Sequence, residues 1–151
     1  MESKSKQMNL GFCHCTLMNE NCCDEKCENR LSKIECDDSI CHWTNQCTNR
    51  RFQKREWCKC EIRKTKKKGF GLFSLQKIKC GDFVTEYVGE IIDMEECQKR
   101  LKKTEYQRRN KCYIIELEKN LFIDATKKGN IGRFVNHSCD PNCQTSKWFR
   151  L

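Results

Sequence analysis

The sequence predicts a mainly β domain of short strands with one surface helix, preceded by a cysteine-rich metal-binding module. Three features lead to this fold class: the distribution of cysteines, four short aromatic and β-branched segments, and one amphipathic stretch. Ten of the fifteen cysteines lie before residue 61 of the 151-residue chain. We therefore divide the chain into a tail at 1–10, a cysteine module at 11–60 and a β domain at 61–151.

The cysteine content and the absence of an apolar leader favour a reducing compartment. MESKSKQMNLGF has charges but no apolar stretch, and no run approaches a membrane span. Fifteen cysteines cannot all pair as disulfides, and such density in a cytosolic or nuclear protein indicates metal binding. A disulfide knot is the alternative. The same argument disfavours N-glycosylation of Asn136, although Asn136-His137-Ser138 has the acceptor pattern.

Basic residues are clustered along the chain. The formal net charge is +9, from 30 Lys and Arg against 21 Asp and Glu. The excess gathers at 50–55 (RRFQKR), at 63–68 (RKTKKK) and between Gln98 and Lys111. Three such clusters favour a polyanionic partner bound less tightly as salt rises, although lysines that only solvate one face give the same pattern. We expect nucleic acid or chromatin nearby, and no membrane.

The second half of the chain contains the predicted strands and the predicted helix. Four segments are short, rich in aromatic and β-branched residues and bounded by turn residues: FGLFSL, DFVTEYVGEII, CYIIEL and LFIDA. Between the second and the third lies MEECQKRLKKTEYQRRN, in which Met94, Cys97 and Leu101 form one narrow apolar stripe. Asp93 is a suitable N-cap for this helix, and Glu96 can complete a capping box.

Seven cysteines of the module have the spacing of zinc ligands. They are Cys13, Cys15, Cys23, Cys27, Cys36, Cys41 and Cys47. Because zinc takes four ligands in a tetrahedron, seven thiolates serve two ions only if one of them bridges. The spacing therefore predicts one ion on Cys13, Cys15, Cys23 and Cys27, and a second ion on Cys23, Cys36, Cys41 and Cys47.

Other residues of the module leave alternatives open. Cys22 is a rival for the bridging position. His14 and His42 each adjoin a ligand cysteine, but thiolates suffice, so we interpret both as spectators. Cys58 and Cys60 supply only half of a tetrahedral site and are interpreted as free thiols.

A set of motifs follows in a fixed order with domain-scale spacing: GFGLF after a basic run, EYVGEIID, and FIDATKKGNIGRFVNHSCDPNC. These motifs resemble the SET-domain lysine methyltransferases. The cysteine module, with CTNRRFQKR at its end, resembles the AWS (associated with SET) zinc module. Together they are similar to the branch that methylates lysine 36 of histone H3. The resemblance runs from about Cys13 to Trp148 and implies a SET-domain fold of short strands and small sheets.

The resemblance implies a histone-lysine N-methyltransferase that uses S-adenosyl-L-methionine, acts on the histone H3 tail in nucleosomes, and works in the nucleus on chromosomes. Its basic clusters would contact nucleosomal DNA. Cofactor binding is assigned to Lys68, Gly69, Phe70, Gly71, Tyr113, Asn136 and His137. The resemblance also implies that Arg133 buttresses this segment. Glu86, Tyr87 and Glu90 lie near the active cleft or simply follow strand alternation.

The end of the chain departs from the family pattern. The resemblance assigns Cys139 to a third zinc ion that needs three further cysteines, and Cys143 to a packed thiol. The family's channel tyrosine is expected beyond Leu151, so no catalytic residue is assigned here, and Cys112 stands where the family has an aromatic residue. The chain is thus either a methyltransferase that lacks the end of its SET domain or an inactive zinc-stapled chromatin-binding fragment. A nucleophilic pair of Cys139 and His137 has no acidic partner or oxyanion motif beside it.

Overall fold

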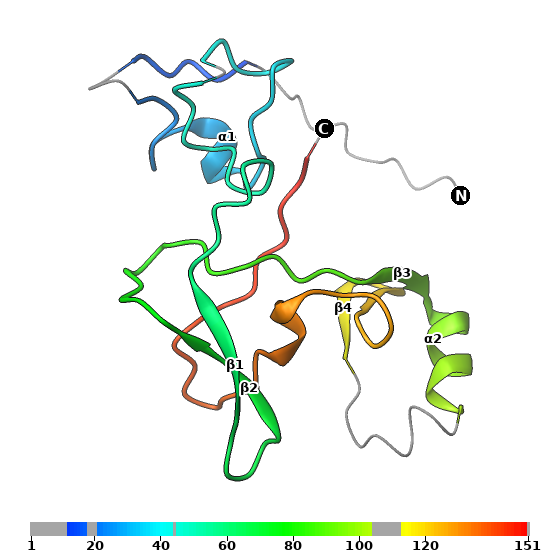
Figure 1. Ribbon diagram of the computed structural model, residues 1–151. Coiled ribbons are helices and arrows are strands. Elements are labelled where there is room, and N and C mark those ends of the chain that lie inside the picture. Colours follow the sequence, from blue (N-terminus) through cyan, green and yellow to red (C-terminus); the bar gives the residue numbers. More distant parts are fainter. Residues whose placement is uncertain (1–11, 18–20, 44, 104–112, 151) are drawn as a thin grey trace, which may run out of the picture. The chain divides into compact units, whose positions relative to one another are not determined.

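The computed structural model describes residues 12–17, 21–43, 45–103 and 113–150 of the chain. It divides into two compact units (Figure 1). The cysteine unit consists of the described residues within Met1–Glu56 and Ser146–Leu151, and the sheet unit is Trp57–Thr145. Each unit is described by itself below. In the described part of the chain, no helix is both long and apolar enough to cross a membrane.

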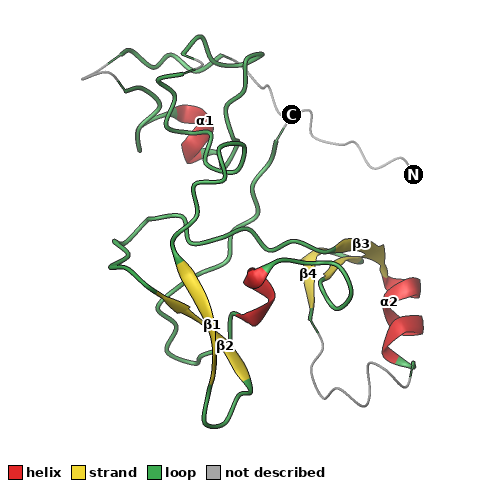
Figure 2. Ribbon diagram, in the orientation of Figure 1, coloured by secondary structure: helices red, strands yellow, loops and turns green. Residues whose placement is uncertain are grey.

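The cysteine unit has little regular structure, and Figure 2 shows it mostly as loop around one short helix, α1 (Glu28–Leu31). Two isolated β-bridges join Cys22 to Cys47 and Ile34 to Phe149. Among its described residues the buried apolar side chains are seven cysteines together with Ile34 and Ile40. So small an aliphatic interior cannot by itself offset the entropy of ordering the chain, so the sulfur atoms must contribute to its stability.

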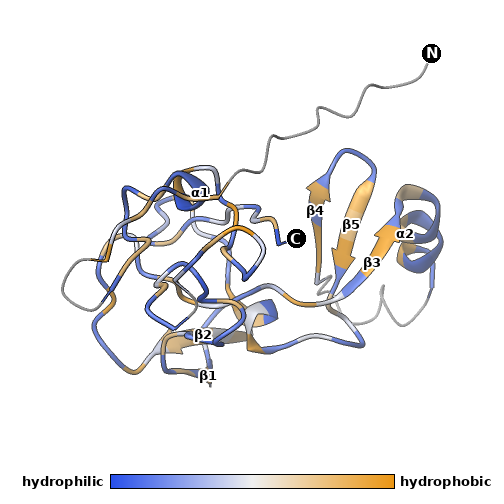
Figure 3. Ribbon diagram, turned by 90° about the horizontal axis from the view of Figure 1, so that it is seen from above, coloured by the Kyte–Doolittle hydropathy of each residue, from blue (hydrophilic) through white to orange (hydrophobic). Residues whose placement is uncertain are grey.

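The sheet unit contains two small antiparallel sheets. One pairs β1 (Cys60–Lys64) with β2 (Phe70–Ser74). The other has the strand order β3–β5–β4, from β3 (Glu90–Asp93), β5 (Leu121–Asp124) and β4 (Ile114–Glu118). A helix, α2 (Met94–Leu101), follows β3, and a short 3-10 helix, η1 (Ile131–Phe134), follows β5. Figure 3 shows hydrophobic residues on β3 and β5. The predicted fold class, short strands and small sheets with one surface helix, is confirmed.

The strands differ in detail from the prediction. The long segment predicted to be a strand from residue 82 enters a sheet only at β3. Just before β3 the backbone of Gly89 passes very close to β5, because a Cβ there would lie 2.6 Å from the carbonyl oxygen of Asp124. The strand β1 was not predicted, since CEIRK was interpreted as half of a thiol pair followed by a basic cluster. Its alternation places Ile62 between charged residues, which is the pattern that indicated a strand.

The N-cap of α2 follows the prediction, and the reciprocal capping-box bond from Glu96 stays a prediction. Asp93 adopts an extended backbone, and its Oδ1 accepts a hydrogen bond of 2.8 Å from the amide of Glu96. This satisfies one of the amide groups that the first helical turn leaves free. The carboxylate of Glu96 accepts a hydrogen bond from Arg100 one turn later. Residues 104–110 of the predicted helix lie outside the described residues.

The predicted apolar stripe of α2 is wrong at both ends. Cys97 is buried, but Met94 and Leu101 are 38% and 43% exposed. The helix is held instead by a charged residue, because Arg100 Nη1 lies 2.8 Å from Oδ2 of the fully buried Asp124 in β5. A buried carboxylate is stable only with such partners, so this ion pair ties α2 to the second sheet.

Arg100 also joins two glutamates. Its Nε lies 2.8 Å from Glu96 Oε1, and its Nη1 lies 3.1 Å from Glu90 Oε2. The nearby guanidinium lowers the pKa of both glutamate carboxyl groups below their ordinary values. Three carboxylates around one guanidinium make this network a structural element, and it gives Glu90 a structural contact in the sheet unit.

We expect Arg100→Met to lower the free energy of unfolding by about 3 kcal/mol, because it removes one partner of a buried ion pair. Lys99→Ala is the matched control, since Lys99 lies on the same helix with its side chain 70% exposed. Loss of its surface pair should change stability by less than about 0.5 kcal/mol. Urea denaturation followed by circular dichroism measures both. Equal effects of the two substitutions would contradict the anchoring role of Arg100.

Candidate functional site

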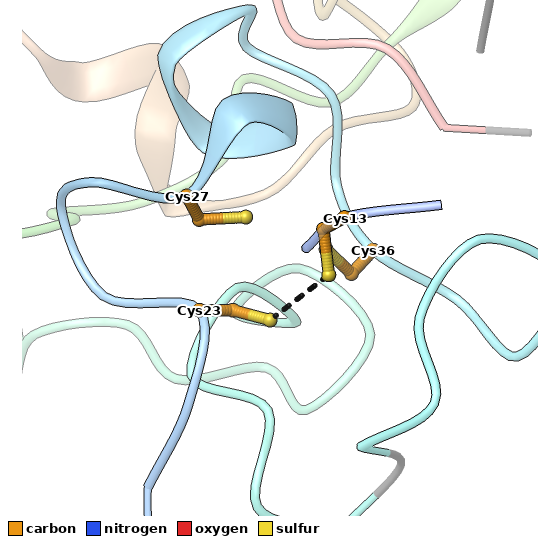
Figure 4. Close-up of side chains that lie close together, drawn as sticks. All are labelled: Cys13, Cys23, Cys27 and Cys36. Atoms are coloured by element: carbon orange, nitrogen blue, oxygen red, sulfur yellow. Dashed lines mark hydrogen bonds between the residues drawn. The ribbon is translucent and has the colours of Figure 1, made fainter. Parts of the chain in front are cut away.

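The buried cysteines bring their sulfur atoms together in two groups. The first consists of Cys13, Cys23, Cys27 and Cys36, and the second of Cys22, Cys23, Cys41 and Cys47. Within each group the four sulfur atoms all lie within 4.8 Å of one another. Four thiolates around one tetrahedral zinc ion are separated by about 3.8 Å, given a zinc–sulfur distance of about 2.3 Å. The side chains of the first group point toward a common centre (Figure 4). The sulfur separations of both groups are compatible with a bound zinc ion.

Cys23 belongs to both groups. Its sulfur lies 3.6 Å from that of Cys13 and 3.5 Å from that of Cys41. Its backbone has a φ of 58°, a left-handed conformation that is uncommon for residues other than glycine. With this bend the neighbouring Cys22 and Cys23 both direct their sulfur atoms into the groups. A strained backbone conformation persists only where the surrounding structure fixes it. Here the position of Cys23 is fixed by two sulfur groups that share this residue.

The groups overlap with the predicted ligand sets but are not identical to them. Six of the seven predicted ligands fall in the groups, with Cys36 in the first group and not in the second. Cys15 lies in neither group: it is half-buried, packs against the cluster, and its carbonyl accepts a 2.7 Å hydrogen bond from Trp43 Nε1. Cys22 occupies the seventh place. Which seven thiolates hold metal stays a prediction.

Both histidines next to these cysteines make contacts elsewhere. His14 Nδ1 lies 3.2 Å from Glu28 Oε2, and both side chains are exposed. The ring of His42 stacks on the ring of Phe12, with 4.6 Å between their centroids. Neither histidine belongs to a sulfur group in the described residues, so the arrangement uses thiolates alone.

The thiols have strongly perturbed acidity. Burial raises the pKa of Cys13 to about 12 and raises that of Cys22 as well. The pKa of Cys36 is lowered instead, first by a hydrogen bond with Cys27, and its sulfur also accepts a 3.2 Å hydrogen bond from Asn49 Nδ2. A metal ion must displace the protons of the raised groups, so metal binding releases protons and weakens as the pH falls.

We expect Cys23→Ser to remove metal from both sites, because its sulfur is the one that the two groups share. Metal content after dialysis, measured by native mass spectrometry, checks this outcome. Cys15→Ser and Cys22→Ser decide the seventh ligand: metal loss with Cys22→Ser alone supports the grouping seen here, and loss with Cys15→Ser alone supports the grouping predicted from spacing. Full metal content in Cys23→Ser would contradict the shared ligand.

The predicted cofactor residues converge at the start of β2. Asn136 Nδ2 donates a 3.0 Å hydrogen bond to the carbonyl of Phe70, and Lys68 Nζ donates one of 2.6 Å to the carbonyl of His137. Gly71 lies directly against this contact, because a Cβ there would stand 2.9 Å from Asn136 Nδ2. Residues separated by more than sixty positions therefore meet at a point where a larger residue at 71 would displace the Asn136 side chain.

The hairpin between β1 and β2 holds this point in place. The amide of Thr65 donates a 2.6 Å hydrogen bond to the carbonyl of Gly69, and the amide of Lys68 donates one of 2.9 Å to Thr65 Oγ1. Gly69 has a φ of 69°, which glycine adopts without a steric penalty. Lys68 and Gly69 thus end the turn of the hairpin and Phe70 and Gly71 begin β2, with the Lys68 side chain directed at His137.

Aromatic rings complete the same surface. Phe134 lies edge-on to Phe70 and to Tyr113, with centroid distances of 6.3 and 5.8 Å. The guanidinium of Arg133 lies 4.9 Å from the centroid of Phe134 and 5.5 Å from that of Tyr113. Its Nη1 also donates to the carbonyl of Ala125 at 3.2 Å. These contacts link the predicted cofactor residue Tyr113 to the hairpin and give Arg133 the geometry of a buttress.

Asn130 is a residue of this site that the sequence analysis did not single out. Its Nδ2 donates a 2.8 Å hydrogen bond to the carbonyl of Glu86, and its Oδ1 accepts one of 3.0 Å from the amide of Gly132. It therefore caps η1 and fixes the strand-like segment before β3, where the hydroxyl of Tyr87 donates to the carbonyl of Tyr113. Its position one residue before Ile-Gly-Arg-Phe was the available indication, since asparagine is a favoured N-cap.

The remaining cysteines of the RFVNHSCDPNC segment lie at the surface. Cys139 is exposed, with its sulfur 3.8 Å from His137 Nε2, and in the described residues it belongs to no group of three metal-binding side chains. Cys143 is also exposed, so its expected role as a packed thiol is wrong. A third zinc ion at Cys139 stays a prediction, and Cys112 lies outside the described residues.

Comparison with known protein families supports both resemblances inferred from the sequence, that of the β domain and that of the cysteine module. Residues 69–150, more than half of the chain, match the model of the SET domain, and residues 18–55 match the model of the AWS domain. The chain therefore belongs to the SET-domain family, with an AWS domain ahead of its SET domain. The resemblance inferred from the sequence is confirmed.

The most informative relatives are long proteins. Mouse histone-lysine N-methyltransferase NSD3 is 44% identical over 90% of this chain, and Arabidopsis thaliana ASHH1, another histone-lysine N-methyltransferase, is 40% identical over 96%. The human histone-lysine N-methyltransferase described as H3 lysine-36 specific is 43% identical over 90% of this chain. The matched regions make up 10%, 30% and 5% of these three proteins, so the chain spans a minor part of each.

Proposed function

We propose that the chain carries the cofactor-binding part of an S-adenosyl-L-methionine-dependent histone-lysine N-methyltransferase that acts on lysine 36 of histone H3 in nucleosomes. The observation that carries this proposal is the meeting of the Lys-Gly-Phe-Gly segment with Asn136 and His137. Family membership and relatives named for H3 lysine 36 support the same substrate class. Such a protein works in the nucleus, on chromosomes.

Each residue of the candidate cofactor site has a role in this proposal. The sulfonium of the bound cofactor supplies a methyl group. Asn136 and His137 hold its amino-acid end and its adenine through amide and backbone groups, while Gly69 and Gly71 let the backbone approach without Cβ obstruction. Tyr113 and Phe70 provide aromatic surface at the edge. The accepting lysine must be neutral despite a reference pKa of about 10.4, and an apolar channel lowers that pKa by desolvation.

The cysteine unit is proposed to hold two zinc ions with Cys23 shared. The sulfur geometry fits tetrahedral thiolate coordination, and the AWS match points to the same metal. The role proposed is structural, because both groups use four thiolates and leave no open coordination position.

The second candidate function is a zinc-stapled chromatin-binding fragment without activity. It is favoured by the basic charge alone, since the tip of the β1–β2 hairpin exposes Lys66 and Lys67 and the net charge is +9. Nucleosomal DNA is the polyanion that a histone-modifying protein meets first. Binding without methyl transfer would separate this function from the proposed one.

We expect Asn136→Ala to weaken S-adenosyl-L-methionine binding by about tenfold to a hundredfold, because a hydrogen bond to a charged group contributes about 1.5–3 kcal/mol. Isothermal titration measures the affinity, and transfer of a radiolabelled methyl group to nucleosomes measures the activity. Glu95→Ala, an exposed change on α2, is the control and should leave both unchanged. Unaltered cofactor affinity in Asn136→Ala would contradict the assigned site.

The double substitution of Lys66 and Lys67 with glutamate should weaken nucleosome binding and reduce its dependence on salt, because fewer phosphates are neutralised. Lys68 is left intact, since it contacts His137. Electrophoretic mobility shifts at several salt concentrations measure the effect. Binding that is insensitive to salt would remove the electrostatic argument.

A further inference from the structure

The residues that follow the candidate cofactor segment belong to the cysteine unit. Phe149 forms a parallel β-bridge with Ile34: its amide donates to the carbonyl of Lys33, and its carbonyl accepts from the amide of Glu35, both at 2.9 Å. Lys33 Nζ adds a 3.3 Å hydrogen bond to Ser146 Oγ. The chain thus returns after more than a hundred residues and makes an isolated bridge with the segment that follows α1.

An aromatic contact fixes the same returning segment. The ring of Trp148 lies against that of Phe52, with centroids 5.8 Å apart, and the guanidinium of Arg51 lies 5.4 Å from the centroid of the Trp148 ring. The surface under Trp148 is itself held by Glu35, a residue only 2% exposed. Its Oε1 accepts hydrogen bonds from the amides of Phe52 and Gln53, at 2.6 and 3.2 Å.

This docking surface is built directly on the sulfur groups. Cys36 follows Glu35, and its amide donates to the carbonyl of Asn49 at 2.9 Å. Asn49 in turn donates from Nδ2 to the carbonyl of Ile34 at 2.8 Å and to Cys36 Sγ at 3.2 Å. The edge that receives Phe149 is therefore positioned by the same residues that position a cluster cysteine.

The other end of the segment is held in the sheet unit, where Asn136 and His137 bond to Phe70 and Lys68. Eight residues separate His137 from Ser146. A segment tied at both ends has far fewer conformations than one tied at a single end, so less ordering is left for a ligand to impose. The cysteine unit can thus influence the cofactor residues through the chain itself.

We infer that the metal-bound cysteine unit anchors residues 146–150 and thereby pre-orders the cofactor segment, so that metal occupancy controls cofactor affinity. Trp148 and Phe149 are positioning residues in this device, since they act through Asn136 and His137. The anchoring stands on the contacts of the cysteine unit alone. Its effect on affinity rests on the proposed function.

The first test follows the backbone by hydrogen exchange in the 151-residue protein, with its metal and after chelation. Chelation should accelerate amide exchange at Glu35 and Phe149, which bond across the bridge, while Ile123 in β5 stays protected. Protection of Phe149 that survives complete metal removal would overturn the inference. If chelation also accelerates amide exchange in β5, the variants of the second test decide whether the anchoring occurs, because those variants keep their metal.

The second test compares Trp148→Ala and Phe149→Pro, which removes the amide bonded to Lys33, with Gln144→Ala, an exposed residue of the same stretch. Both variants should retain full metal content by mass spectrometry and bind S-adenosyl-L-methionine about tenfold more weakly, as when the competent population falls to about a tenth. Gln144→Ala should bind normally. Unchanged affinity in both variants would refute the positioning role.

The two proposals fail in different ways. If the metal-loaded protein binds no S-adenosyl-L-methionine at all, the proposed function fails, and exchange at Phe149 still decides whether metal anchors the segment. If the cofactor binds but chelation changes neither its affinity nor the exchange at Phe149, the anchoring inference alone is wrong.

Discussion

The cysteine unit depends on seven thiols that share one small volume around Cys23. Sulfur atoms 3.5–3.6 Å apart are too distant for disulfide bonds and too close for several thiolates to coexist without a cation. The zinc ions proposed above would resolve this conflict, because each would neutralise the charge and fix the directions of four side chains at once. Because little aliphatic core lies behind them, the folding of this unit would be coupled to the binding of those ions.

The candidate cofactor site relies on a different kind of restraint. Phe70 is 52% exposed, and Asn136 and His137 also lie at the surface, so burial does not hold them. Two side-chain-to-backbone hydrogen bonds and a set of edge-on rings define their positions. Such a surface keeps its hydrogen-bonding groups available to a ligand, at the expense of rigidity that a buried core would provide.

Much of this arrangement was predictable, because the motifs are specific and zinc chemistry limits how thiols can be spaced. The N-cap at Asp93, the strands after residue 112 and the convergence of Lys68 with His137 all follow the sequence. The ion pair by which Arg100 anchors α2 was not predictable, because the sequence of α2 indicates a helix held by an apolar stripe. The grouping of Cys22 in place of Cys15 was hidden as well, because spacing along the chain does not reveal the left-handed turn at Cys23.

The contact between Gly71 and Asn136 couples the effects of substitutions at two positions that are far apart in the sequence. Gly71 does not need glycine for its own backbone, because its φ lies outside the left-handed region occupied by Gly69 and Gly81. A Cβ at 71 would instead lie 2.9 Å from the side-chain amide of Asn136, which would have to move to make room for it. An alanine at 71 would therefore displace the Asn136 side chain from its 3.0 Å hydrogen bond with the carbonyl of Phe70. A substitution at 71 would thus change the position of the Asn136 amide, whereas a shorter side chain at 136 would leave Gly71 undisturbed.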